Sequence, residues 1–205
     1  MAQTATVRFD ARTKVFRLDS GGTSYVFGVN PRGELQQLYW GGRLGVKDSF
    51  PKAKPAREWA SFDSSYTNTP QEYAGWGAGL FNEPALKVSF ADGNRDLVLH
   101  YLSHTLNGSH VSVLLKDISR DVRVELQYDI DPDSGILARS ARIENHTGKS
   151  LVVQQAAAAT WTVLPGPGAG PTGKILQGWP STRPATSTLL TRETSSSARS
   201  RPAGP

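Results

Sequence analysis

The sequence predicts an all-β protein built as an antiparallel β-sandwich, and three observations predict that class. Apolar and polar residues alternate with a period of about two in many short segments, as they do in strands that bury one face. Clusters of Gly, Asn, Asp and Ser that suit tight turns separate these segments. No long segment shows the period of about 3.6 residues that marks an amphipathic helix.

Each alternating segment predicts a strand, which gives nine or ten strands in all. In chain order they are Thr6–Phe9, Val15–Leu18, Tyr25–Val29, Leu86–Phe90, Leu97–Leu102, Val111–Leu115, Val122–Tyr128, Ile136–Ile143 and Leu151–Val163. Because a sandwich buries alternate residues of each strand, part of its core is also predicted. The expected core residues are Val98, Tyr101, Val111, Val113, Val124 and Leu126.

The segment Gly41–Pro84 interrupts this pattern with prolines and glycines and predicts one long irregular loop. Half of the aromatic residues lie between Tyr39 and Phe81, which is too many for a disordered segment. Trp40, Trp59 and Trp76 fall outside the alternating strands and are expected to find cover elsewhere. Aromatic faces beside polar side chains suit a sugar, and they also suit a protein interface.

The last forty residues differ in composition from the rest, so the sequence predicts a sandwich domain at 1–165 and a low-complexity, disordered tail at 166–205. The tail is rich in Pro, Gly, Ser, Thr and Ala. It also carries most of the formal charge of +5, with five basic residues against one acidic residue, whereas the first 165 residues hold 18 basic and 17 acidic residues. The body therefore lacks the basic face that nucleic-acid binding would need, and no nucleic-acid partner is expected.

Composition also limits the expected cellular location and the kinds of site that the chain can form. There are no cysteines, so neither a disulfide scaffold nor a thiolate metal site is expected. The polar start of the chain lacks a secretion signal, and no segment approaches the roughly 20 apolar residues that span a bilayer, so a cytoplasmic protein without a membrane role is expected. No cofactor is predicted.

Two constellations resemble sites and are interpreted as structural. The carboxylates of Asp129–Asp133 stand before Pro and Gly, which is typical of an Asp-rich turn, so no catalytic residue is assigned to them. His100 and His104 are four residues apart in a predicted strand and would share a face with Asp96. We expect solvent-facing histidines here and no metal, because no third close ligand is evident.

The long loop and the strands after it carry a resemblance to a known family. The segments Ser61–Asp63, Pro70–Tyr73 and Gly75–Gly77, followed by Glu83–Leu86 and Asp92–Tyr101, are similar in order and spacing to glycoside hydrolase family 36. Further matching segments are Gly135–Ser140, Ile143–Thr147 and Ala156–Trp161. The resemblance covers about Thr13 to Pro165.

This resemblance implies the N-terminal, supersandwich-like domain of an α-galactosidase. Members of the family hydrolyse terminal α-galactosides with two aspartates on a separate (β/α)₈ barrel, so this chain is expected to be inactive alone. The domain is expected to contact the barrel or a second subunit through Gly41–Pro84. Asp63, as a hydroxyl acceptor, and Trp76, as a wall, are the residues expected to bind the sugar in the full enzyme, in a loop where Asn68, Gln71 and Glu72 could add polar contacts.

The sequence departs from the family pattern in two places. Gly79–Asn82 replaces a stretch that often holds an acidic residue and an arginine, and Gly166–Pro205 does not match the further strands of the family. The composition of this tail is typical of a shifted reading frame in a GC-rich gene. Two other functions stay open: a stand-alone carbohydrate-binding module that uses the aromatic loop, and a purely structural interaction module.

Overall fold

The computed structural model describes residues 5–55, 69–80 and 83–160, and within these ranges it contains ten strands and no helix. The strands are β1 (Thr6–Asp10), β2 (Val15–Ser20), β3 (Thr23–Val29), β4 (Leu35–Gly42), β5 (Leu86–Phe90), β6 (Leu99–Asn107), β7 (His110–Asp117), β8 (Val122–Ile130), β9 (Leu137–Asn145) and β10 (Leu151–Ala156). The described residues thus hold no helix that is long and apolar enough to cross a membrane. The predicted tail, Gly166–Pro205, lies outside these ranges.

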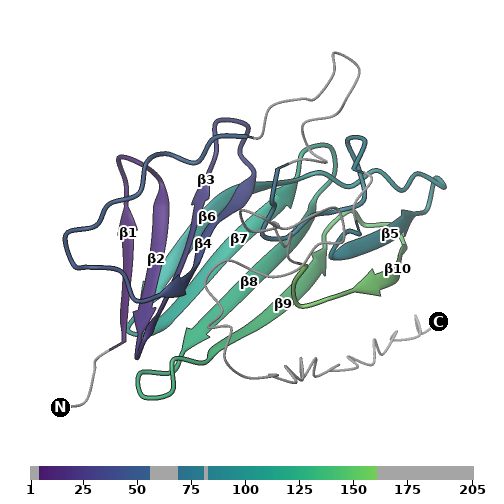
Figure 1. Cartoon of the computed structure of the whole chain (residues 1–205). Coiled ribbons are helices and arrows are strands. Elements are labelled where there is room, and N and C mark those ends of the chain that lie inside the picture. The colour runs from purple at the N-terminus through teal and green to yellow at the C-terminus, as the bar shows by residue number, and fades with distance from the viewer. Residues whose placement is uncertain (1–4, 56–68, 81–82, 161–205) are drawn as a thin grey trace, which may run out of the picture.

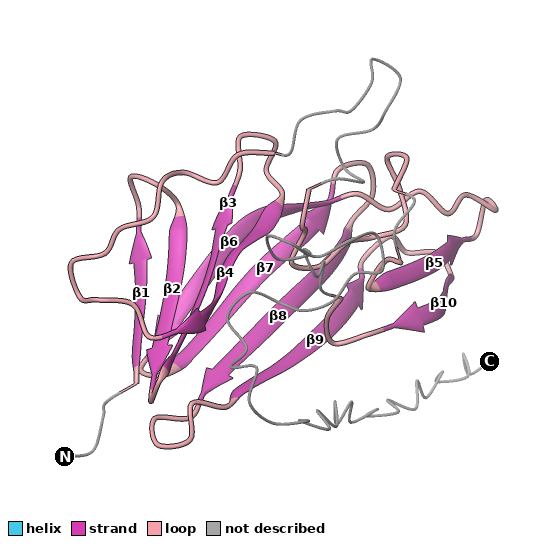
Figure 2. Ribbon diagram, viewed as in Figure 1, coloured by secondary structure: helices cyan, strands magenta, loops and turns pink. Residues whose placement is uncertain are grey.

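The strands form two four-stranded antiparallel sheets and one strand pair. The first sheet has the order β1-β2-β3-β4 and the second has the order β6-β7-β8-β9, while β5 pairs with β10. The two large sheets face each other, and the β5–β10 pair lies beside one end of the second sheet (Figure 1). The predicted class, an all-β antiparallel sandwich, is confirmed (Figure 2).

The core forms where the inner faces of the two large sheets meet. Phe27 of β3 stacks on Tyr128 of β8, with ring centroids 4.8 Å apart and planes 20° from parallel. Period-two alternation predicts this face well, because register fixes which side chains point inward. Five of the six predicted core residues are buried, namely Val98, Val111, Val113, Val124 and Leu126, and Tyr101 is partly buried against the same cluster.

Strand β4 is absent from the predicted strands, and its geometry explains why. The register between β3 and β4 shifts between Val26 and Phe27, where the partners pass from Tyr39 to Gln37 and leave Leu38 as an extra residue. Such a bulge breaks the period of two that identifies a strand in sequence. In addition, β10 ends at Ala156, short of the predicted Val163, whose position lies outside the described residues.

The first part of the long loop covers the outer face of the first sheet. Every residue of β2 is buried, including Arg17 and Asp19, which point away from the sandwich core. The Arg17 guanidinium donates to the backbone oxygens of Leu44 (2.8 Å) and Asp48 (2.9 Å) and pairs with Asp19 at 2.9 Å. This half of the loop is therefore fixed to the sheet by charged hydrogen bonds, which are stronger than neutral ones.

Candidate functional site

The second part of the long loop, residues 69–80, runs through the domain between β4 and β5. The backbone N–H of Glu72 donates to Leu35 at 2.7 Å, and that of Gln37 donates to Pro70 at 2.8 Å. Gly75 then forms a parallel bridge with Leu86 of β5. The segment is thus held at both ends by strand-like hydrogen bonds, although the sequence predicts only an irregular loop.

Glu72 lies at the centre of a buried polar cluster that joins this segment to both sheets. Its side chain is fully buried and accepts hydrogen bonds from the hydroxyls of Tyr25 (2.5 Å) and Tyr128 (2.9 Å). Arg139 of β9 pairs with the Glu72 carboxylate at 3.1 Å, and the Arg139 side chain is only 5% exposed. Since an unpaired charge in the interior is costly, the pair is expected to fix the position of the segment.

The same cluster shifts the protonation equilibria of its members. Burial disfavours the charged form of Arg139, yet the neighbouring Tyr128 and Glu72 outweigh burial and raise the arginine pKa. Burial raises the pKa of Tyr128 well above its usual value. It also raises the pKa of Tyr73 to about 12, against a smaller opposing effect of Arg139. Tyr128 and Tyr73 are therefore held neutral beside the Glu72–Arg139 ion pair.

The Gly75–Trp76–Gly77 turn presses against the chain that leads into β6. A Cβ atom on Gly75 would clash with the backbone oxygen of Leu97, and one on Gly77 would lie 2.5 Å from Oδ1 of Asp96. The same Asp96 oxygen accepts the backbone N–H of Ala78 at 2.9 Å. Glycines are required here because the backbones approach so closely.

Trp76 stands out of this turn and is 37% exposed. The Lys87 ammonium and the Arg95 guanidinium lie 5.9 Å and 5.8 Å from its ring centroid, which is within the range of cation–π contacts. The ring is therefore a partly exposed aromatic surface with two cations nearby. Asp63, the other residue expected to bind sugar, lies outside the described residues, as do Trp59 and Asn68.

The polar neighbours expected around Trp76 are placed differently. Glu72, expected to offer oxygens to a sugar, is buried in the core and faces Arg139. The sequence does not predict the buried role of Arg139, because a charged residue in the alternating pattern of β9 is normally expected to face solvent. The signal that could have identified it is its position: Arg139 is directly opposite Tyr128, which lies on the predicted inner face of β8.

The two histidines do not share a face. A register shift between Tyr101 and Ser103 leaves Leu102 as an extra residue, so His104 turns inward and His100 turns to the opposite side. The ring centroids of His104 and Phe9 are 4.2 Å apart, and His104 forms a hydrogen bond of 2.7 Å with the Tyr101 hydroxyl. The expectation that His104 faces solvent is therefore wrong. Asp96 precedes β6, which begins at Leu99. The described residues contain no group of three ligands that could hold a metal ion.

The acidic run at the end of β8 forms a turn, as expected. Oδ1 of Asp131 accepts the backbone N–H groups of Asp133 (3.2 Å) and Ser134 (2.7 Å). The hydroxyl and backbone N–H of Ser134, followed by the N–H of Asp133, lower the Asp131 pKa. Asp129 pairs with His110 at 2.7 Å. These carboxylates stabilise local structure.

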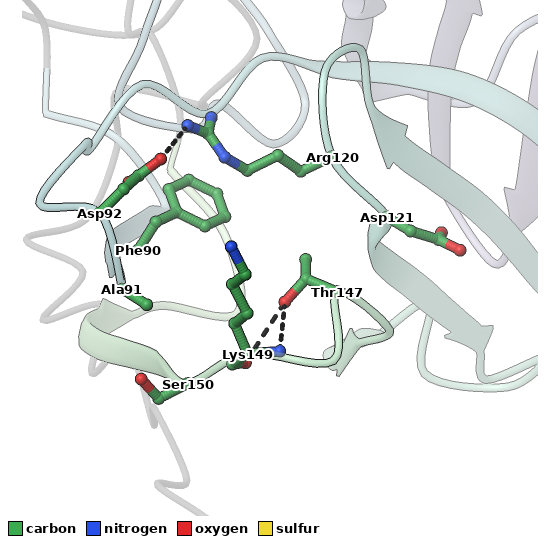
Figure 3. Close-up of a pocket in the computed structure, with 8 residues that line it drawn as sticks. All are labelled: Phe90, Ala91, Asp92, Arg120, Asp121, Thr147, Lys149 and Ser150. Carbon is green, nitrogen blue, oxygen red and sulfur yellow. Dashed lines mark hydrogen bonds and ion pairs between the residues drawn. The ribbon is translucent and has the colours of Figure 1, made fainter.

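A hollow of about 300 Å³ opens beside the start of β8, at the opposite end of that strand from the Asp131 turn. Figure 3 shows the residues that line it. Three turns line it: the end of β5, the β7–β8 connection and the β9–β10 connection. The lining residues are Phe90, Ala91, Asp92, Arg120, Asp121, Thr147, Lys149 and Ser150. Arg120 lies 4.1 Å over the Phe90 ring and pairs with Asp92 at 3.0 Å.

The fold and the sequence together define a carbohydrate-enzyme domain. Residues 33–167 match the model of the Glycosyl hydrolase family 36 N-terminal domain, so the chain belongs to that family. It is 27% identical over 201 residues to α-galactosidase AgaA of Geobacillus stearothermophilus, covering 78% of this chain and 27% of AgaA. It is also 25% identical over 177 residues to the bifunctional α-galactosidase/sucrose kinase AgaSK of Mediterraneibacter gnavus, covering 74% and 19% of the two chains.

Solved structures show the same fold. The α-galactosidase AgaB of Geobacillus stearothermophilus superposes with a TM-score of 0.64 at 27% identity, over 75% of this chain and 24% of AgaB. A variant of AgaA, solved in complex with raffinose, superposes with a TM-score of 0.59 at 26% identity, over 71% of this chain and 24% of that one. The chain thus spans about a quarter of the length of these relatives.

Proposed function

We propose that this chain serves as the non-catalytic N-terminal domain of an α-galactosidase, and that hydrolysis of terminal α-galactosides requires a catalytic domain beyond this sequence. The family match carries the proposal, because it covers most of the sandwich and the reported relatives are α-galactosidases of which this chain corresponds to about a quarter.

The roles of the buried carboxylates support an inactive domain. Retaining glycosidases place two carboxyl groups about 5 Å apart on either side of an accessible sugar. In this chain Glu72 is buried against Arg139, and Asp19 is buried between Arg17 and Arg8. Asp117, also buried, caps the turn that precedes β8. A sugar could not reach these groups without disrupting the core.

The segment Gly41–Pro84 supplies the proposed contact with the catalytic domain or a second subunit. Trp76, near the end of this segment, is 37% exposed, and Trp40, which directly precedes it, is 38% exposed, so both rings offer apolar surface to a partner. In the assembled enzyme we propose that Trp76 forms a wall of the sugar pocket and that Asp63 accepts a sugar hydroxyl. Both roles require the partner surface.

An activity assay tests the non-catalytic role. The purified chain, incubated with a chromogenic α-galactoside, should release no more product than a buffer blank. Turnover that persisted through purification and disappeared on substituting a carboxylate of this chain would contradict the proposal. Trp76→Ser should likewise release no more product than the blank. In sedimentation velocity the same substitution should reduce self-association, because the exposed ring is part of the proposed contact surface.

A carbohydrate-binding module is the second candidate, and the partly exposed Trp76 ring, with Lys87 and Arg95 nearby, is the observation that favours it. Titration with galactose and raffinose, followed by tryptophan fluorescence, separates the two functions. The domain hypothesis predicts no saturable change for the isolated chain. Saturable quenching that Trp76→Ser abolishes, with Trp40→Ser as the matched control, would instead establish the binding module.

A further inference from the structure

The hollow of Figure 3 lies on the β7–β8 and β9–β10 turns, outside the long loop to which the family resemblance assigns sugar contacts. Its apolar floor is Phe90, which is 7% exposed, together with Ala91. The charged groups of Arg120, Asp92 and Lys149 stand around this floor (Figure 3). A volume of about 300 Å³ is at the lower end of the range for small-molecule pockets.

Two side chains hold the walls of the hollow in place. Oδ2 of the buried Asp117 accepts the backbone N–H groups of Ser119 (3.1 Å) and Arg120 (2.7 Å), which fixes the β7–β8 turn. On the other side, Oδ1 of Asn145 accepts the backbone N–H of Thr147 at 3.1 Å and its hydroxyl at 2.7 Å. Walls that are already ordered reduce the entropy lost when a ligand binds.

The charges in the hollow do not balance. Arg120 and Asp92 pair with each other at 3.0 Å. The Asp121 carboxylate accepts hydrogen bonds from Nε and Nη2 of Arg123, at 2.8 Å and 3.0 Å. Arg123 does not line the hollow, so the charge of Asp121 is balanced by a residue outside it. Within the described ranges, no carboxylate pairs with the Lys149 ammonium, which extends toward Phe90 and the Arg120–Asp92 pair (Figure 3).

We propose that this hollow binds a small oxyanion, a phosphate or carboxylate group of a low-molecular-weight ligand, between Lys149 and Arg120. Lysine would act as the point charge, and the guanidinium would offer donors in a plane that matches such groups. The Ser150 hydroxyl, also in the lining, can donate a further hydrogen bond, whereas the Thr147 hydroxyl already donates to Asn145. The remainder of the ligand would lie along Ala91 at the rim of the hollow, because the Arg120 guanidinium already covers the Phe90 ring.

Nuclear magnetic resonance of the full chain tests the site directly. Inorganic phosphate and acetate are titrated in separate arms at constant ionic strength, with chloride as the reference anion, and backbone amide shifts are followed. We expect saturable shifts in the millimolar range confined to Ala91, Arg120, Asp121 and residues 147–150. Saturation by phosphate alone would identify a phosphate site, and saturation by acetate would identify a carboxylate site.

Two variants and a control make the test specific. Lys149→Gln should weaken binding about tenfold, because it removes one charge-assisted hydrogen bond, and Arg120→Lys should weaken it less because the charge is kept. Lys52→Gln, at an exposed lysine of the first loop, should change nothing. The proposal is overturned if neither anion gives saturable shifts in these turns, if chloride gives the same shifts, or if Lys149→Gln binds as tightly as the unaltered chain.

Discussion

The Glu72 carboxylate and the Arg139 guanidinium form an ion pair of 3.1 Å inside the domain, although the residues are 67 positions apart in sequence. The guanidinium also donates to the backbone oxygen of Glu72 at 3.1 Å and lies 4.8 Å from the Tyr128 ring centroid. Glu72 is thus fixed by both its side chain and its backbone. The pair joins the loop segment that carries Trp76 to the second sheet.

Removing one partner of this pair should therefore be costly. Glu72→Gln keeps the size of the side chain but leaves the Arg139 charge buried without a counter-charge, and we expect a loss of about 3–5 kcal/mol in the free energy of unfolding. Urea unfolding followed by circular dichroism measures it. The matched control is Glu125→Gln, which removes one of two carboxylates near the 67% exposed Arg142, at 3.8 Å, and leaves Glu144 at 2.8 Å. It should cost about 1 kcal/mol or less. Equal effects of the two substitutions would show that the buried pair has no special role.

The tyrosine hydroxyls around Glu72 should differ from that of Tyr73. Tyr128→Phe removes a hydrogen bond of 2.9 Å to a buried carboxylate and should cost about 1.5–3 kcal/mol. The Tyr73 hydroxyl is buried and has no hydrogen-bond partner among the described residues, so Tyr73→Phe should be neutral or slightly stabilising. Thermal and urea unfolding of the two variants compare them. A larger loss from Tyr73→Phe than from Tyr128→Phe would contradict this assignment.

High pH should unfold the domain through the same tyrosines. Folding raises the Tyr73 pKa from 10.0 to about 12. Below pH 10 the phenol is therefore protonated in both the folded and the unfolded chain, and its contribution to the free energy of unfolding is fully present. As the pH rises from about 10 to 12, the unfolded chain loses this proton first, and stability should fall by about 1.4 kcal/mol per pH unit for each such tyrosine. Unfolding free energies across this interval measure the slope. The slope of unfolding free energy against pH should be shallower in Tyr73→Phe. An unchanged slope would exclude Tyr73 as a cause of the loss of stability at high pH.

The sequence predicts strands well where a sheet buries one face, and less well where polar residues are buried. In β8, buried and half-buried residues alternate from Val122 to Tyr128 because one face meets the core, so the pattern is visible in the sequence. Strand β4 was not predicted because the extra residue Leu38 interrupts its alternation, and His104 changes face because of the extra residue Leu102. A bulge is set by contacts between strands, and single-sequence periodicity does not contain them.

The candidate site was predictable only in part for a related reason. Trp76 is visible in sequence because an aromatic residue between two glycines lies outside the strand pattern. The role of Glu72 depends on Arg139, 67 positions away, and no local pattern links the two. The hollow at Lys149 likewise combines three turns that are far apart in the chain. Residues brought together by the fold are thus the ones that sequence reasoning missed.

The close approach of the Trp76 turn to Leu97 gives the last prediction. Gly77→Ala would place a Cβ atom 2.5 Å from Oδ1 of Asp96 and 2.7 Å from the backbone nitrogen of Leu97, and this nitrogen is held by the Trp76 carbonyl at 3.1 Å. Because backbone atoms cannot move aside as a flexible side chain can, the turn must shift, and we expect a loss of about 1–3 kcal/mol.

The shift should also be visible at the tryptophan itself. The indole N–H resonance of Trp76, assigned with Trp76→Phe, should move in Gly77→Ala because the ring changes its position relative to Lys87 and Arg95. Gly42→Ala is the matched control, since a Cβ there meets nothing within 4 Å, and it should leave both stability and the Trp76 resonance unchanged. If Gly77→Ala were as stable as the unaltered chain and its Trp76 resonance stayed in place, the glycine would not be required by packing, and its place beside the tryptophan would need another explanation.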